Sequence, residues 1–247
     1  MLSGAPVSSS SRADQLLEQF LQGSDRQARA LVNALRQQAA DLAPLIADGL
    51  GAANRNGESW RHGFLLQVLA SAKAAGGARG LDPFPEGWLI APSARGLDYA
   101  PLQGHLLRQE FEEADRLTSA HLRQLAGPEA ERRGYVYFSE VAPIPGLDLR
   151  SLDRLWLAYS LGRFGFSVQG RLLRVCGHRW EALWLRLGWK RDGVWTRYPT
   201  AFTWSLEAPE GHMPLINQLR GVRLMDALLH HPAVQERTEG GVATRAS

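Results

Sequence analysis

The segment from residue 189 to 213 has the side chains most suited to binding chemistry, because five aromatic residues gather there on a chain without helical periodicity: Trp189, Trp195, Tyr198, Phe202 and Trp204. Pro199 and Pro209 interrupt any helix, and Asp192-Gly193 is typical of a hairpin turn. So many aromatic side chains argue against disorder. We expect an ordered loop that either covers the core or offers aromatic faces to a protein or ligand.

A second irregular stretch, residues 127–147, also has apolar side chains on a connector: Tyr135, Val136, Tyr137, Phe138 and Val141. Two such loops beside a helical core predict a cleft with apolar walls, suited to a flat ligand. Residues 162–204 have eight basic and two acidic side chains, a net +6 that favours an anionic ligand.

Motifs for catalysis are missing from the sequence. It has no phosphate-binding loop, dinucleotide fingerprint, nucleophile elbow or H-E-x-x-H pair. Glu112, Glu113 and Asp115 fall early in a predicted helix, where we expect them to be solvated and to stabilise its N-terminus. The lone Cys176 provides neither a disulfide nor a thiolate metal site, so no protein-held metal is predicted.

Composition limits the classes of protein that remain. The chain has 247 residues, 45% of them hydrophobic, which is enough for a sizeable core. A net charge of +3 is smaller than the positive charge typical of a dedicated nucleic-acid-binding protein. No apolar run reaches the length of a membrane span or signal peptide, so we expect a cytoplasmic protein whose membrane contact, if any, is peripheral.

Helical periodicity predicts an all-α fold. Ser24 and Gln27 have the spacing of a capping box, within a series of short helices over residues 13–75. Further helices are expected over 98–107, 111–126, 149–161, 168–175, 180–187 and 214–230.

A Gly- and Pro-rich stretch, residues 76–96, predicts a connector. We therefore expect a small helical bundle with this connector over 1–96, a core domain over 97–232 and a polar C-terminal tail over 233–247.

Three strings of the core domain, LDYAPLQGHLLRQEFEEADRLTSAHLRQLAG, LDRLWLAYSLGRFGFSVQGRL and GWKRDGVWTRYPTAFTWSLEAPEGHMPLINQLRGVR, closely resemble the Genomes-Uncoupled-Four family. The resemblance runs from about Leu97 to Pro232, and the N-terminal helices look like the small bundle of cyanobacterial members. It implies a non-enzymatic regulator of chlorophyll biosynthesis that binds protoporphyrin IX and Mg-protoporphyrin IX. It also implies that the chain activates magnesium chelatase by associating with its large porphyrin-binding subunit, in the cytoplasm or at the thylakoid surface.

Carried over to this sequence, the resemblance places the porphyrin between the two loops. The implied contacts are Phe138 and Val141 on the shorter loop, Trp195, Tyr198 and Phe202 on the longer loop, and Asn217 and Arg220 after it. Tyr198 is a departure, since related cyanobacterial sequences have Trp there.

Each polar candidate has a chemical role. Arg220, helped by Arg197 or Arg191, can bind a propionate with a bidentate fork. Asn217 can approach the porphyrin magnesium axially, because magnesium prefers oxygen ligands.

Two other classes remain open from the sequence. The aromatic loops of a helical adaptor would bind a partner protein instead of a porphyrin. A haem- or porphyrin-modifying enzyme is disfavoured because the sequence has no C-x-x-C-H and no convergent acid-base pair.

Overall fold

The computed structural model describes residues 9–57, 59–74, 87–215 and 222–243. It confirms the all-α class, since the described strands are two residues long each and all other regular elements are helical. The chain divides into two units, Met1–Leu89 and Ile90–Ser247, each described here by itself. The division falls a few residues before the boundary at 96/97 that the connector composition predicts.

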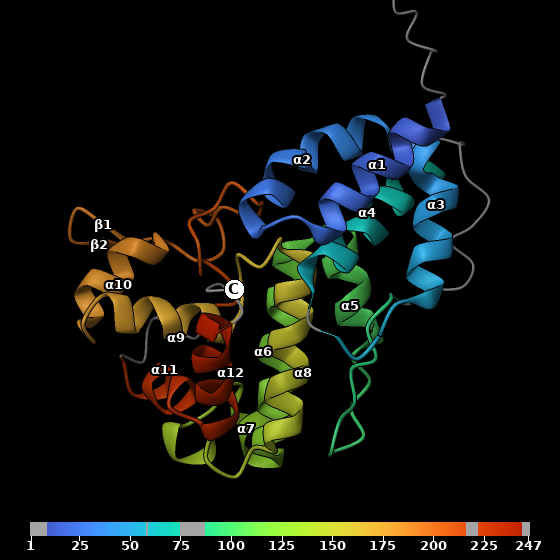
Figure 1. Ribbon diagram of the computed structural model, residues 1–247. Helices are drawn as coiled ribbons and strands as arrows, with labels where there is room; N and C mark the ends of the chain where they lie inside the picture. The colour runs from blue at the N-terminus through green and yellow to red at the C-terminus, as the bar shows by residue number, and fades with distance from the viewer. Residues whose placement is uncertain (1–8, 58, 75–86, 216–221, 244–247) are drawn as a thin grey trace, which may run out of the picture. The chain divides into compact units, whose positions relative to one another are not determined.

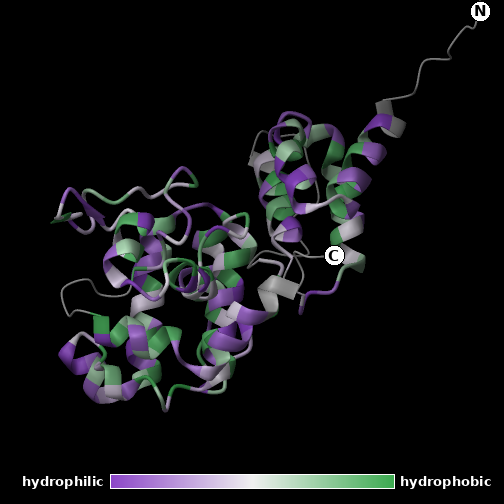
Figure 2. Ribbon diagram, turned by 60° about the vertical axis from the view of Figure 1, so that its left-hand side comes forward, coloured by the Kyte–Doolittle hydropathy of each residue, from purple (hydrophilic) through white to green (hydrophobic). Residues whose placement is uncertain are grey.

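The first unit is a bundle of four helices, α1 (Ser9–Gln22), α2 (Asp25–Gln37), α3 (Ala39–Ala52) and α4 (Trp60–Ala74). Ser24 and Gln27 form the predicted capping box at the start of α2. After α4 the chain returns to the bundle at Trp88, whose indole is fully buried and donates to the Leu50 carbonyl at 3.2 Å. The helices of this unit mix hydrophobic and hydrophilic residues (Figure 2). α2 is amphipathic and buries Ala28, Val32 and Leu35 on one side, whereas α4 is buried at every position from Phe64 to Leu69.

The second unit has eight α-helices among the described residues, with one 3-10 turn and one hairpin. They are α5 (Ala100–Leu107), α6 (Phe111–Ala126), α7 (Pro128–Arg133), the turn η1 (Phe138–Glu140), α8 (Gly146–Tyr159), α9 (Phe166–Val175), α10 (Trp180–Leu187), β1 (Lys190–Arg191), β2 (Val194–Trp195), α11 (Val222–Leu229) and α12 (Pro232–Ala243) (Figure 1).

Trp156 of α8 is the centre of this unit's core. Its ring is fully buried, stacks on Phe111 at 6.1 Å between centroids and meets Phe164 edge-on. The indole N–H donates to Thr118 Oγ1 of α6 at 3.0 Å, so its polar atom is satisfied inside the core. α8 and α6 are therefore joined by one aromatic side chain.

Gly165 allows α9 to begin against α8. It has φ of +136°, and a Cβ there would lie 2.7 Å from Asp153 Oδ1. Because that space is free, the Ser167 amide reaches Asp153 Oδ1 at 2.9 Å. A side chain at 165 would displace this buried contact.

The C-terminal residues differ from the predicted polar tail, because Pro232–Ala243 form α12. Ala233 and Val234 are buried, and Arg237 Nε lies 2.6 Å from Asp153 Oδ2 in an ion pair hidden from solvent. The sequence looks polar here because it contains Glu236, Arg237 and Glu239, and composition cannot show that Arg237 is paired inside the protein.

The helix expected over 214–230 also differs. Pro214 and Leu215 are not helical, and the described helix α11 begins at Val222. Pro232 does not simply stop this helix but occupies the first position of α12, where its missing N–H costs nothing.

The hairpin turn is confirmed. Lys190 pairs with Trp195 and Arg191 with Val194, and Asp192 and Gly193 have φ of +49° and +77°. Two successive positive φ values are the geometry of a type I′ turn. In the described part of the chain, no helix is both long and apolar enough to cross a membrane.

Candidate functional site

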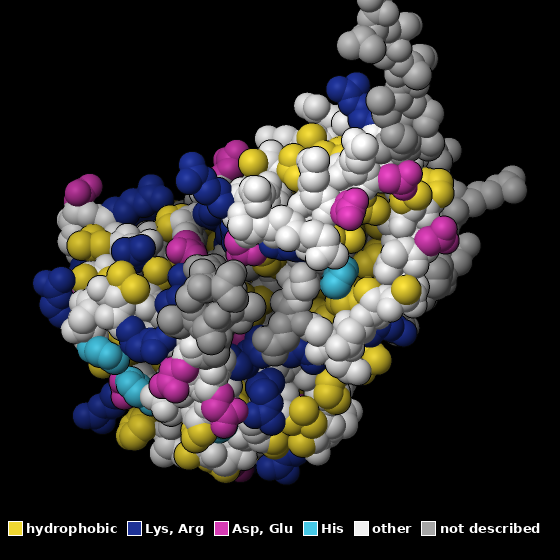
Figure 3. All heavy atoms as spheres, in the orientation of Figure 1, with side chains coloured by type: hydrophobic (Ala, Val, Ile, Leu, Met, Phe, Trp, Pro, Cys, Tyr) yellow, Lys and Arg dark blue, Asp and Glu magenta, His cyan; other side chains and the backbone are white. Residues whose placement is uncertain are grey.

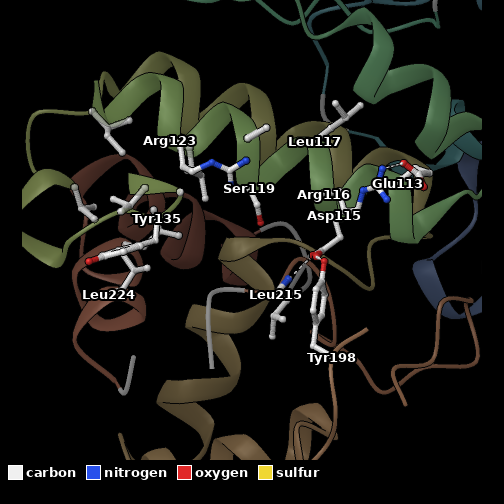
Figure 4. Close-up of a pocket in the computed structure, with 17 residues that line it drawn as sticks. Glu113, Asp115, Arg116, Leu117, Ser119, Arg123, Tyr135, Tyr198, Leu215 and Leu224 are labelled. Carbon is white, nitrogen blue, oxygen red and sulfur yellow. Dashed lines mark hydrogen bonds and ion pairs between the residues drawn. The ribbon is translucent and has the colours of Figure 1, made fainter. Parts of the chain in front are cut away.

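The second unit has a cavity of about 610 Å³, within the range of small-molecule sites. One wall is α6, and the others come from residues 134–144, from Tyr198 and Leu215, and from α11 (Figure 4). It is lined by Glu113, Asp115, Arg116, Leu117, Ser119, Ala120, Leu122, Arg123, Gly134, Tyr135, Val136, Val141, Ile144, Tyr198, Leu215, Leu224 and Leu228.

The residues on the side of α6 that lines the cavity explain why the cavity is open. Arg116, Ala120 and Arg123 lie four and three residues apart and so share one side of the helix. Ser119 and Ala120, in the middle of that stretch, are small and leave the volume beside the helix open. The cavity therefore has a helical wall with small residues at its centre and basic residues toward both ends.

Asp115 is buried and holds the longer loop in place. Its Oδ2 accepts from the Tyr198 hydroxyl at 3.1 Å, and its Oδ1 accepts from the Leu215 amide at 2.6 Å (Figure 4). A single carboxyl group thus binds both ends of the segment 198–215. The expectation of a solvated Asp115 at the helix start was wrong, because this loop covers it.

Burial also changes the acidity of this group. Desolvation raises the pKa of Asp115 to about 7, although the hydrogen bonds from Leu215 and Tyr198 by themselves lower this pKa. The pKa of the Tyr198 hydroxyl is raised by its own burial and then by the neighbouring Asp115. The hydroxyl is therefore protonated at neutral pH and acts as the donor.

Arg133 holds the shorter loop. Its Nη2 donates to the Tyr135 carbonyl at 3.0 Å and to Glu140 at 2.6 Å. Its guanidinium lies 4.0 Å from the Tyr137 ring centroid, and Glu140 in turn accepts from the Tyr137 amide at 2.7 Å. These contacts fix residues 135–140, which contribute Tyr135 and Val136 to the cavity.

The longer loop folds back on the core over part of its length and faces the cavity at Tyr198. Phe202 stacks on Trp204 at 5.5 Å and lies 4.7 Å from the tilted His212 ring, and Trp189 is fully buried with its N–H bonded to the His212 carbonyl at 2.8 Å. Tyr198 meets Phe202 edge-on at 5.6 Å and Trp204 edge-on at 5.8 Å. Phe202 and Trp204 therefore support the Tyr198 ring, whereas Trp189 and Trp195 pack on Trp184.

A family model described as GUN4-like matches residues 92–232, which include the whole cavity lining. The match covers more than half of the chain. This chain belongs to the GUN4-like family. The resemblance of its three core strings to the Genomes-Uncoupled-Four family is thereby confirmed.

Relatives of this GUN4-like chain include a Ycf53-like protein of Synechocystis, 50% identical over 60% of this chain and 64% of its own length. The chloroplastic tetrapyrrole-binding protein of Arabidopsis thaliana is 38% identical over 53% of this chain and 53% of its own length. The matches thus span less than two thirds of these relatives.

Two solved structures of the family are similar to this chain. GUN4 from Chlamydomonas reinhardtii has a TM-score of 0.57 at 39% identity, covering 60% of this chain and 94% of that one. Ligand-free Arabidopsis thaliana GUN4 has a TM-score of 0.52 at 38% identity, covering 56% of this chain and 99% of that one.

The structure brings together only some of the residues predicted for the site of this GUN4-like chain. Val141 and Tyr198 line the cavity, and Phe202 lies behind Tyr198. Phe138 and Trp195 are exposed and lie outside the lining. Asn217 and Arg220 lie outside the described residues.

The basic side chains of residues 162–204 lie outside the cavity, although their net charge was expected to favour an anionic ligand there. Arg191 and Arg197 are exposed, and the lining includes no residue between 145 and 197. On the face shown in Figure 3, basic side chains gather over α9, α10 and the hairpin. The cavity takes its described cations from α6 instead.

The residues of α6 that line the cavity were missed from the sequence, where the start of this helix was interpreted as a solvated acidic turn. The spacing of Arg116, Ser119, Ala120 and Arg123 places them on one side of the helix, but it does not show whether that side faces solvent or a cavity. Leu224 and Leu228 of α11 were missed because their partners lie far away in sequence.

Proposed function

We propose that this GUN4-like chain binds a tetrapyrrole in the cavity of its second unit, with protoporphyrin IX and Mg-protoporphyrin IX as ligands. The cavity of about 610 Å³ within the family match carries this proposal. The name of the Arabidopsis relative, a tetrapyrrole-binding protein, supports it.

The walls suit a flat apolar ring. Val136, Val141, Ile144, Leu224 and Leu228 provide aliphatic surface. Burying a few hundred Å² of macrocycle at roughly 25 cal/mol per Å² contributes on the order of 5 to 10 kcal/mol. Association costs about 4 to 15 kcal/mol, so the polar groups and the fixed loops must decide the affinity.

Among the implied contacts, we propose that Val141 and Tyr198 touch the macrocycle and that Phe202 keeps the Tyr198 ring in position. Phe138 and Trp195 would take part only through a movement of their loops toward the cavity. Arg220 as a propionate ligand and Asn217 as an axial contact to magnesium remain proposals from the resemblance.

The biological role is a further part of the proposal. The chain would act as a non-catalytic regulator that stimulates magnesium chelatase by associating with its large porphyrin-binding subunit. It would work in chlorophyll biosynthesis, in the cytoplasm or at the thylakoid surface. Family membership and the resemblance of the core strings support this role.

A chelatase assay at limiting magnesium tests this role. The full chain is added to the chelatase subunits with protoporphyrin, and Mg-protoporphyrin is followed by fluorescence. We expect a higher rate with the chain than without it, and no product from the chain alone. An unchanged rate would contradict the regulatory role, and product from the chain alone would indicate an enzyme.

A protein adaptor is the second candidate, favoured by one observation. Val175, Leu185 and Val194 are 63%, 57% and 70% exposed on α9, α10 and the hairpin. Apolar side chains in such positions can meet a partner protein. Stimulation of the chelatase without any porphyrin binding by the chain would favour this alternative.

A further inference from the structure

Arg123 is a cation in the cavity whose charge no other described residue compensates. It lies in the last turns of α6, is half-buried and lines the cavity (Figure 4). Among the residues that the structure describes, no acidic side chain is paired with its guanidinium. A half-buried guanidinium beside aliphatic walls is a strong site for an anion, because its fork can hold both oxygens of a carboxylate.

The other charged residues of the lining lie toward the opposite end. Arg116 is paired with Glu113 at 3.0 Å, and Asp115 is bound to Tyr198 and Leu215 (Figure 4). Asp115 and Arg123 are eight residues apart, about 12 Å along the helix axis at 1.5 Å per residue. The cavity is therefore polarised, with carboxyl groups near the start of α6 and the uncompensated positive charge near its end.

A tetrapyrrole of the proposed kind has its two propionates on one edge of the ring. We propose that Arg123 binds one of these carboxylates, which directs that edge toward Arg123 and away from Glu113 and Asp115. This inference rests on the proposed function. It assigns to Arg123 of α6 a propionate contact that the resemblance alone gives to Arg220. It also determines the orientation of the macrocycle in the cavity.

Titrations with protoporphyrin IX and with its dimethyl ester test the inference, because the ester has the same ring without the negative charges. Binding to the full chain is followed by porphyrin absorbance at pH 7.5 and 0.15 M salt. The variants are Arg123→Gln and Arg123→Lys. Arg132→Gln is the matched control, since the Arg132 side chain is 71% exposed in α7, lies outside the lining and pairs with Glu129.

We expect Arg123→Gln to weaken binding of the acid tenfold or more and to leave binding of the ester within about twofold. A tenfold loss corresponds to about 1.4 kcal/mol and is expected when a charge-assisted contact is removed. Arg123→Lys should recover part of the loss, and Arg132→Gln should bind both ligands as the unmodified chain does.

Three results would overturn the role of Arg123: unchanged binding of the acid by Arg123→Gln, an equal loss for acid and ester, or an equal loss in Arg132→Gln. Failure of the unmodified chain to bind either ligand is a different outcome. It would contradict the proposed function itself.

Discussion

Asp115 shows how one side chain can organise a site. It sits at the edge of the cavity, fully removed from solvent, and binds Tyr198 and Leu215, residues 83 and 100 positions away in the chain. A buried carboxyl group is costly to ionise, so its burial raises its pKa to about 7. The loop geometry at the cavity is thereby coupled to pH.

This coupling predicts a pH-dependent stability. The unfolded chain releases the Asp115 proton near pH 4, whereas the folded protein keeps it until about pH 7, so the free energy of unfolding falls as pH rises through this window. Asp115→Asn should remove up to about 3 kcal/mol of the fall between pH 5 and pH 8, at 1.36 kcal/mol per unit.

Urea unfolding of the wild type and variant at both pH values measures the difference. Glu131→Gln removes an exposed carboxylate of α7 that lies outside the cavity lining and does not act on Asp115, and it should leave the pH dependence unchanged. An identical fall in the Asp115→Asn protein would contradict a raised pKa at Asp115.

The sequence could predict that Asp115 lies early in a helix, but not what covers it. A helix start enriched in Glu112, Glu113 and Asp115 indicates solvation, because local sequence contains no information about a loop that returns 83 residues later. Val141 and Tyr198, which line the cavity, could be named from the sequence because they lie on the two irregular loops that fall within the family resemblance. Arg123 required the structure, since only the fold shows that it faces a cavity and that no described acidic side chain pairs with it.

At the scale of elements, α12 is bound to α8 by two ion pairs in different environments. Arg237 and Asp153 are 2.6 Å apart, with side chains 7% and 0% exposed. Arg150 and Glu236 are 3.6 Å apart and 41% and 69% exposed. Removing one member of a buried pair leaves a buried charge alone, whereas an exposed pair is already screened by water.

We therefore expect Arg237→Ala to lower the free energy of unfolding by about 3 to 5 kcal/mol and Arg150→Ala by less than about 1 kcal/mol. Thermal or urea unfolding of the two variants provides the comparison. Equal small effects would mean that residues 232–243 behave as the frayed tail that their composition suggests.

Helices were the most predictable part of the fold. The capping box at Ser24 and the glycine ends of α6 and α10 were visible in the sequence, because they are local features. The helix expected over 214–230 was wrong at its start, because Pro214 and Leu215 are not helical, whereas Val222–Leu229 form α11 within the expected range. Leu215 is held by Asp115 instead, a tertiary contact that helical periodicity does not reveal.

At the scale of the whole molecule, the second unit includes the cavity, the family match and its own core. The solved Arabidopsis chain is matched over 99% of its length while covering 56% of this one, so a chain of that extent folds alone in a relative. We expect residues 90–247 alone to unfold cooperatively and to bind protoporphyrin within about threefold of the full chain.

Unfolding of the shortened protein by urea and its porphyrin titration check this expectation. Loss of folding or of binding would show that the first unit, residues 1–89, is needed by the second.

The central claim is that the cavity beside α6 holds the tetrapyrrole, and one titration tests it most directly. Protoporphyrin IX is added to the unmodified chain, to Ala120→Trp, which fills the cavity from its helical wall, and to Leu185→Trp, which adds the same ring on the exposed face of α10. We predict saturable one-to-one binding by the unmodified chain and by Leu185→Trp, and at least tenfold weaker binding by Ala120→Trp. Equal binding by all three proteins would contradict the claim.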